Sequence, residues 1–156
     1  MSPIAFVELQ DGPDIKHMII YGPPGQGKTT GALSAPGPIL LLNVEGPSRA
    51  KFARRQYPGK EIRELAVHGK ADIENAFLYL REGKGGEQTT VIDSMGELYR
   101  VLLADIAKDD MHPTLPEYLD VQTIIRRFGD SLRYLPQVLV MVCHEDLMHE
   151  EITGEI

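Results

Sequence analysis

The stretch HMIIYGPPGQGKTT, His17 to Thr30, decides the fold of this chain. Its opening residues, 17–21, are mostly apolar or β-branched and predict a short buried strand. Residues 22–29 then match the pattern G-x-x-x-x-G-K-S/T at every specified position. A helix is predicted over 29–35, because the Pro-Gly-Pro sequence at 36–38 ends it. A strand, a glycine-rich loop and a helix in this order are typical of a loop that binds nucleotide phosphates.

Each residue type in this loop has a part in holding phosphate. Glycines let the backbone adopt conformations that a Cβ would forbid, so that successive N–H groups converge on one anion. Lys28 brings a full positive charge to the outer phosphates, and Thr29 supplies a hydroxyl to Mg²⁺. The helix that follows adds free N–H groups and the positive end of its dipole. The residues expected to contact the nucleotide are Gly22, Pro23, Pro24, Gly25, Gln26, Gly27, Lys28, Thr29 and Thr30.

Composition limits the class of protein. A chain of 156 residues is long enough for one domain that buries roughly two-thirds of its unfolded surface. The single cysteine, Cys143, has no internal disulfide partner, which suits a reducing cytoplasm. No apolar run reaches the length needed to cross a bilayer, so no membrane partner is expected. The net charge of −7 argues against indiscriminate nucleic-acid binding by the whole surface, although a local basic groove remains compatible with it.

The rest of the chain alternates between strand and helix patterns. A continuous apolar run, PILLLNV at 38–44, predicts a central strand buried on both faces. Further strands are predicted over 62–67, 89–92 and 137–143, and helices over 72–81, 97–107 and 117–135. The last of these helices is expected to break or bend near Gly129. The apolar segment 2–10 is expected to form an edge strand or an extended arm, and the cationic stretch 49–60 has Lys51, Arg54 and Arg55 at helical spacing.

This alternation predicts an α/β fold with a mostly parallel central sheet flanked by helices. Ligands of such sheets bind at the carboxyl ends of the strands, so the polar residues just past each strand are candidates for chemistry. Asp93 follows TTVI and suits a carboxylate that holds Mg²⁺, with Ser94 beside it; the alternative is a helix N-cap before Glu97. Glu45 follows PILLLNV and is a candidate general base, or else a solvated carboxylate at a turn. His144, after the last strand, is a candidate donor to the γ-phosphate, or else a structural histidine.

The segments YGPPGQGKTT, LLNVEG, TTVIDS and VLVMVCHE, in that order, resemble the RecA-like P-loop ATPase core. They are most similar to small phage proteins of the nucleotide-binding AAA type, which include single-strand annealing proteins. The resemblance runs from Lys16 to Glu145 and implies a single RecA-like domain over 1–156, short at its C-terminus. It implies that Lys28, Glu45 and His144 are catalytic and that Thr29 and Asp93 hold the metal. RecA usually has glutamine at the last of these positions, whereas histidine resembles the phage branch.

The resemblance also implies the function: an Mg²⁺-dependent ATPase that acts on single-stranded DNA in phage recombination or replication, in the host cytoplasm. Such proteins are commonly homo-oligomers, and Arg54 or Arg55 would be candidates to complete a neighbour's site. Two features depart from the family pattern. The chain stops at Ile156, and the tail after His144 is acidic, which would repel DNA phosphates. A set of arginines on the predicted long helix offers another DNA contact, although a solvated helix face explains it as well: Arg126, Arg127 and Arg133.

Two other functions use the same loop. A kinase for a nucleotide or small metabolite would need a second substrate pocket and an arginine-bearing lid, and it would leave Glu45 without a purpose. A non-catalytic, nucleotide-gated binding module would need only the loop, with Glu45 ending a turn. A GTPase is disfavoured, because the sequence has no N-K-x-D motif to read guanine.

Overall fold

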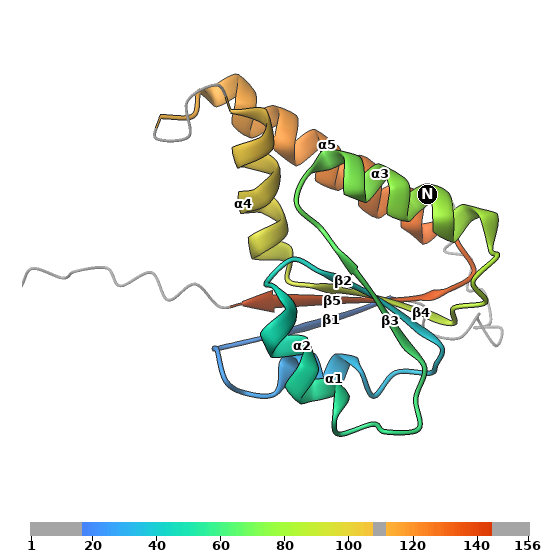
Figure 1. Cartoon of the computed structure of the whole chain (residues 1–156). Coiled ribbons are helices and arrows are strands. Elements are labelled where there is room, and N and C mark those ends of the chain that lie inside the picture. The colour runs from blue at the N-terminus through green and yellow to red at the C-terminus, as the bar shows by residue number, and fades with distance from the viewer. Residues whose placement is uncertain (1–16, 108–111, 145–156) are drawn as a thin grey trace, which may run out of the picture.

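The computed structural model describes residues 17–107 and 112–144, with the side chains of 47–49 excepted. In this part of the chain, the parallel sheet lies between two layers of helices (Figure 1). The strands are β1 (His17–Gly22), β2 (Ile39–Asn43), β3 (Ile62–Ala66), β4 (Thr89–Asp93) and β5 (Val138–His144). The helices are α1 (Lys28–Ala32), α2 (Pro47–Arg54), α3 (Lys70–Glu82), α4 (Met95–Ile106) and α5 (Leu115–Arg133).

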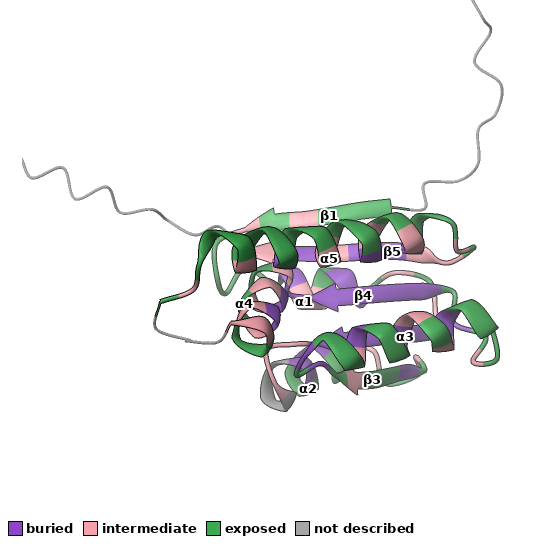
Figure 2. Cartoon of the chain, turned by 90° about the horizontal axis from the view of Figure 1, so that it is seen from above, coloured by how far each residue is buried: buried purple, intermediate pink, exposed green. Residues whose placement is uncertain are grey.

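The sheet has the strand order β1-β5-β4-β2-β3, and every pair is parallel. The α/β prediction is therefore confirmed, and so are all of the strands predicted between 17 and 143. The prediction that the first strand is buried is wrong for the described residues, because β1 lies at the edge of the sheet, where Ile19 is 63% and Tyr21 65% exposed. β2 and β4 are buried along their whole length, as Figure 2 shows for β4, because helices cover both faces of the central strands. The order brings the ends of β1 and β4 to either side of β5, although they are far apart in sequence.

Each face of the sheet has its own core. On one face α1 and α2 pack Ala32, Leu33 and Ala53 against alternate residues of the central strands. On the other face α3, α4 and α5 bury a larger cluster that includes Leu42 and Leu102. The phosphate loop and α1 lie in the thinner layer, below the sheet in Figure 1.

The first helix is shorter than predicted. α1 ends at Ala32 rather than at 35, and the chain continues through turns to Pro38. Lys60 lies across this end, where its ammonium donates to the carbonyl oxygens of Leu33, Ser34 and Ala35 at 2.7–2.9 Å. A cation at the last carbonyls satisfies acceptors that the ending helix leaves open. A side chain distant in sequence therefore stabilises the turn, which periodicity alone does not reveal.

Two further features differ from the sequence prediction, and a third prediction falls outside the described residues. The cationic stretch forms helix α2, which begins at Pro47 and ends at Arg54. The predicted break near Gly129 is wrong, because α5 continues through it from Leu115 to Arg133. The arm predicted over 2–10 lies outside the described residues. In the described part of the chain, no helix has the length and apolar character needed to cross a membrane.

Substituting Leu102 by alanine should test the larger core. Leu102 is fully buried between α4 and the sheet, so Leu102→Ala should lower the free energy of unfolding by about 2–5 kcal/mol. The matched control is Leu78→Ala on α3, where leucine is 43% exposed and the change should stay within about 1 kcal/mol. Urea unfolding followed by circular dichroism measures both. Equal losses for the two variants would contradict this description of the core.

Candidate active site

The loop between β1 and α1 has the backbone geometry that its glycines predict. Gly25 and Gly27 have φ angles of 79° and 76°, in the left-handed region that side chains disfavour. Lys28 is only 7% exposed, and its ammonium donates to the carbonyl oxygens of Gly22 and Pro23, both at 2.7 Å. The lysine thus closes the loop on itself. Because α1 has only five residues, its dipole is weaker than that of a long helix. The loop amides and Lys28 must therefore supply more of the positive potential.

The loop is joined to the middle of the sheet through Thr29. Its hydroxyl donates to Oδ2 of Asp93 at 2.6 Å, across β5. Asp93 is 4% exposed, and its other oxygen, Oδ1, is buried and has no hydrogen-bond partner in the part of the chain described. The two residues predicted to hold the metal are therefore in contact.

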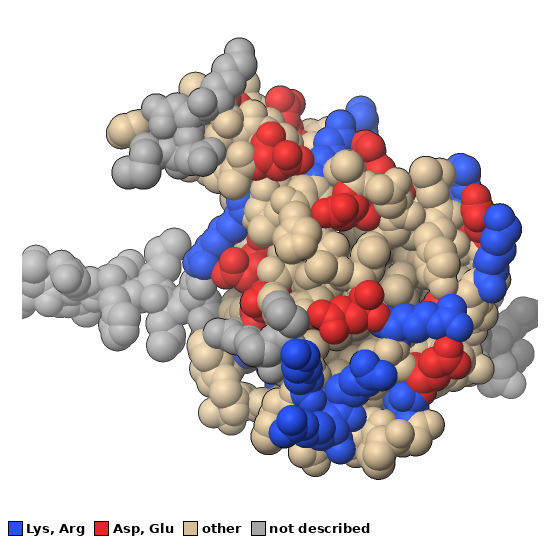
Figure 3. Space-filling view, in the orientation of Figure 1, with Lys and Arg blue, Asp and Glu red and all other residues tan. Residues whose placement is uncertain are grey.

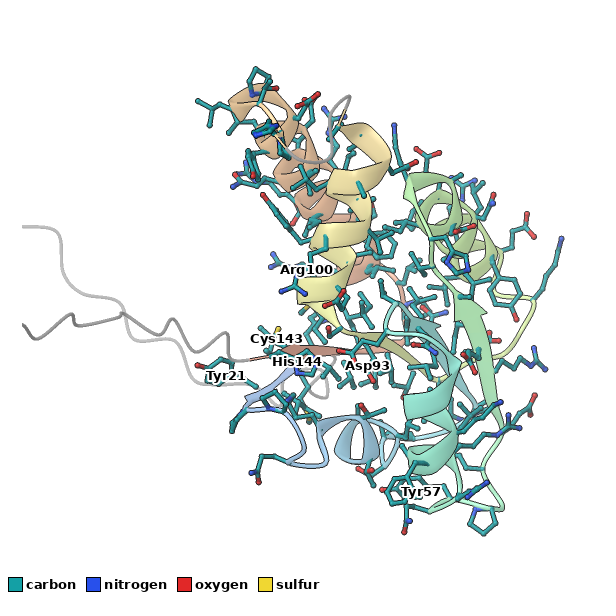
Figure 4. All side chains as sticks on the ribbon, turned by 60° about the vertical axis from the view of Figure 1, so that its left-hand side comes forward. Tyr21, Tyr57, Asp93, Arg100, Cys143 and His144 are labelled. Atoms are coloured by element: carbon teal, nitrogen blue, oxygen red, sulfur yellow. The ribbon has the colours of Figure 1, made fainter. Side chains whose placement is uncertain are left out.

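Glu45 and His144 meet above Asp93 because of the strand register. In the sheet Asn43, Asp93 and Val142 lie side by side, and β4 ends at that level. β5 continues to His144, and the chain after β2 continues to Glu45, so both pass the end of β4 by two residues. Nε2 of His144 is hydrogen-bonded to Oε1 of Glu45, which requires a proton on that nitrogen. Figure 4 shows His144 and Asp93 at the same edge of the sheet.

Asn43 holds the turn that carries Glu45. Its side-chain amide is buried and donates to the carbonyl oxygen of Gly46 at 2.9 Å and to Oε1 of Glu64 at 2.7 Å. The backbone N–H of Val44 also donates to the carbonyl of Asp93 at 2.9 Å. Sequence reasoning missed Asn43, although an asparagine at the end of an otherwise apolar strand was the available signal.

A cavity of about 460 Å³ opens over the loop, between α1 and α2. It is lined by Pro24, Gly25, Gly27, Lys28, Thr29, Thr30, Glu45, Phe52, Ala53 and His144. Three of the residues expected to contact the nucleotide, Gly22, Pro23 and Gln26, are not among these. Phe52 was not predicted. It is a phenylalanine 67% exposed on α2, beside the cationic residues that drew attention to that stretch.

The carboxylates suit a divalent cation. Ligand atoms of Glu45, Asp93 and His144 all lie within 4.8 Å of one another. Burial raises the pKa of Asp93, and the hydrogen bond from Thr29 and the charges of His144 and Lys28 lower it, while Glu45 raises it further. The buried Oδ1 without a partner and the hydroxyl of Thr29 are oxygen ligands of the kind that Mg²⁺ prefers.

The predicted alternative for Asp93 as a helix cap is wrong, because Ser94 occupies that position. Ser94 is fully buried, and its hydroxyl accepts a hydrogen bond from the backbone N–H of Glu97 at 3.5 Å. Ser94 was predicted to lie beside the metal, and the structure shows that it also caps helix α4.

The arginines considered for DNA lie far from this site. Arg126, Arg127 and Arg133 are exposed on α5, which covers the opposite face of the sheet from α1 (Figure 1). Arg133 pairs with Asp130 at 3.7 Å, one turn away on the same helix. Arg54 and Arg55, by contrast, belong to the α2 segment beside the cavity.

Comparisons with known proteins agree with the fold described above. A family model described as an AAA domain matches residues 15–154. Among solved structures, the chain resembles the KaiC-like protein PH0186 of the hyperthermophilic archaeon Pyrococcus horikoshii OT3, with a TM-score of 0.53 and 16% sequence identity. The alignment covers 83% of this chain and spans 62% of the length of that protein. Together they support a RecA-like fold and a P-loop ATPase family. No curated protein matches the sequence significantly.

Substituting Asp93 by asparagine should remove a pH-dependent loss of stability. Because the folded chain raises the pKa of Asp93 above 3.8, the protonated form is favoured by folding, and this contribution is lost as the pH rises through the folded pKa. Without Mg²⁺, the wild type should therefore lose stability relative to Asp93→Asn over that pH range.

Urea unfolding of both proteins at a series of pH values, with EDTA, measures the difference. Adding Mg²⁺ should then stabilise the wild type and leave Asp93→Asn unchanged. A stability difference that does not vary with pH would contradict this account of Asp93.

Proposed function

The chain belongs to the AAA domain family, and we propose that it binds ATP with Mg²⁺ and hydrolyses it at the carboxyl edge of its sheet. One observation carries the proposal: Glu45, held by His144, stands above Asp93 at the wall of the phosphate-loop cavity. A carboxylate beside a phosphate site is what hydrolysis requires and what a simple binding loop has no use for.

The loop would hold the β- and γ-phosphates. Its left-handed glycines would let the N–H groups converge on one anion, and Lys28 is buried beside them. On binding, the ammonium of Lys28 would exchange contacts with two carbonyl oxygens for contacts with phosphate oxygens, which carry more negative charge. Thr29 and Asp93 would hold Mg²⁺, which neutralises charge on the transferred phosphoryl group.

Glu45 would orient the attacking water and accept its proton. Before the nucleotide binds, the hydrogen bond from Nε2 of His144 holds the carboxylate, and Asn43 fixes the turn beneath it throughout. His144 lines the same cavity, so the imidazole would exchange its contact with Glu45 for one with the γ-phosphate when the nucleotide is bound. Positioning and electrostatics, rather than covalent chemistry, account for catalysis of this kind.

Phe52 would be the platform for the base. It lines the cavity from α2 and is 67% exposed, although an aromatic side chain of this size is normally buried. Stacking against an exposed aromatic ring is a common way to hold a nucleobase.

We propose further that the chain acts on single-stranded DNA in phage recombination or replication, as the sequence resemblance implies, within the host cytoplasm and as a homo-oligomer. The charge distribution is compatible with this. Figure 3 shows Lys and Arg gathered over the α2 region, where Lys51, Arg54 and Arg55 are exposed, although the chain is acidic as a whole. In an assembly, Arg54 or Arg55 would supply charge to a neighbour's phosphates.

Glu45→Gln should abolish hydrolysis and keep binding. The amide preserves the shape of the side chain but does not accept a proton, so the rate of phosphate release should fall roughly 10²–10⁴-fold. Phosphate release from Mg·ATP, with and without single-stranded DNA, measures the rate, and titration with a fluorescent ATP analogue measures binding. The control Glu74→Gln, an exposed carboxylate on α3, should behave as the wild type. Tight binding with no release by the wild type under any condition would refute the ATPase and favour a gated binding module.

Phe52→Ala should weaken nucleotide binding without altering the catalytic carboxylates. Loss of one base–aromatic contact corresponds to about 1–3 kcal/mol, or roughly five- to 150-fold in affinity. Phe52→Tyr keeps the ring and should bind as the wild type. Because the ring stacks on a base, the loss should be much smaller for inorganic triphosphate than for ATP. Equal losses for the two ligands would show that Phe52 does not contact the base.

A further inference from the structure

A second cavity opens on the other side of His144. It has a volume of about 220 Å³, roughly half that of the phosphate-loop cavity, and is lined by Gly96, Glu97, Tyr99, Arg100 and His144. The imidazole of His144 is thus a wall shared by both cavities. Figure 4 shows Arg100 on the side of α4 that lies over the end of β5, with Cys143 and His144 beneath it.

Gly96 lies in the first turn of α4, where neither packing nor backbone geometry requires a glycine. A Cβ built at this position would meet no heavy atom within 4 Å, and φ is not in the left-handed region. Glycine inside a helix is less stable than alanine. The missing side chain at this position lets a ligand approach the helix backbone closely.

The polar groups of the cavity suit a flat molecule with donors and acceptors on its edge. The guanidinium of Arg100 donates to Oε1 of Glu97 at 2.8 Å, so a donor and an acceptor lie side by side at the rim. Their side chains are 67% and 35% exposed, which leaves both accessible. Tyr99 packs partly against the core and gives the cavity a rigid aromatic edge. Because the two charges cancel, the site suits a neutral base better than a phosphate group.

We propose that this cavity holds one unpaired nucleobase of a single-stranded nucleic acid. The proposal rests on the proposed function, because it names where the strand contacts the chain. Bases displaced from a stack are commonly held between side chains and read along their edges by arginine and carboxylate groups. The volume admits a single base rather than a run of bases. Since His144 also contacts Glu45, a base packed against the imidazole would be sensed at the site of hydrolysis.

An abasic strand, which keeps the sugar–phosphate backbone but has no bases, distinguishes contacts with bases from contacts with the backbone. In fluorescence anisotropy with a non-hydrolysable ATP analogue and Mg²⁺, the wild type should bind a labelled single-stranded oligonucleotide at least about tenfold more tightly than an abasic strand of equal length. Gly96→Leu fills the open space and should lose this preference. Gly129→Leu is the matched control, because it is a helical glycine on α5 whose Cβ also meets nothing within 4 Å, and it should keep the preference.

Arg100→Met should weaken binding of the base-bearing strand and leave binding of the abasic strand unchanged. The slope of affinity against salt concentration should not change. A loss of about one unit in that slope would instead show a phosphate contact and overturn the base site. Equal binding of both strands by the wild type, or unchanged preference in Gly96→Leu, would overturn it as well. So would a free nucleoside monophosphate that competes as tightly as the strand. A chain that hydrolyses ATP but binds no oligonucleotide would refute this proposal and leave the ATPase intact.

Discussion

The site depends on where the strands end: β2 and β4 end level, at Asn43 and Asp93, whereas β5 continues two residues further, to His144. Asn43, Asp93 and Val142 are level in the sheet, and Glu45 and His144 lie beyond that level on opposite sides. Since adjacent strands are about 4.8 Å apart, two side chains that flank a strand can meet only above its end. The contact between Glu45 and His144 above Asp93 is therefore a result of strand length and register. A longer β4 would separate the carboxylate from the histidine.

Rigid supports surround this contact. Asn43 joins the turn that carries Glu45 to β3 through Glu64, and Thr29 joins the phosphate loop to Asp93. On the outer side, the hydroxyl of Tyr57 donates to the carbonyl of Thr30 at 3.0 Å, and Lys60 closes the end of α1. The short helix α1 is thus held at both ends by side chains from elsewhere in the chain. Sites that position substrates to within fractions of an ångström need supports of this kind.

The distribution of charge reconciles an acidic chain with anionic ligands. Positive groups are placed where phosphate would lie: Lys28 in the loop and the exposed cations of α2 beside it. The cavity beyond His144 carries a balanced pair, Glu97 and Arg100. One histidine therefore separates a region suited to phosphate from a region suited to an uncharged base, and it contacts the carboxylate proposed to activate water.

The sequence by itself determined the α/β class, the strands and the identity of the loop, because strand periodicity and glycine spacing are local properties. It also identified Glu45, Asp93 and His144, since polar residues that end apolar strands mark the binding edge of a parallel sheet. Only the tertiary structure decided which of these touch, because contact depends on strand order and register. It alone brought Asn43, Lys60, Phe52 and Gly96 into the account. The role of each residue depends on a neighbouring residue or an open space that distant segments of the chain create. No local sequence pattern reveals it.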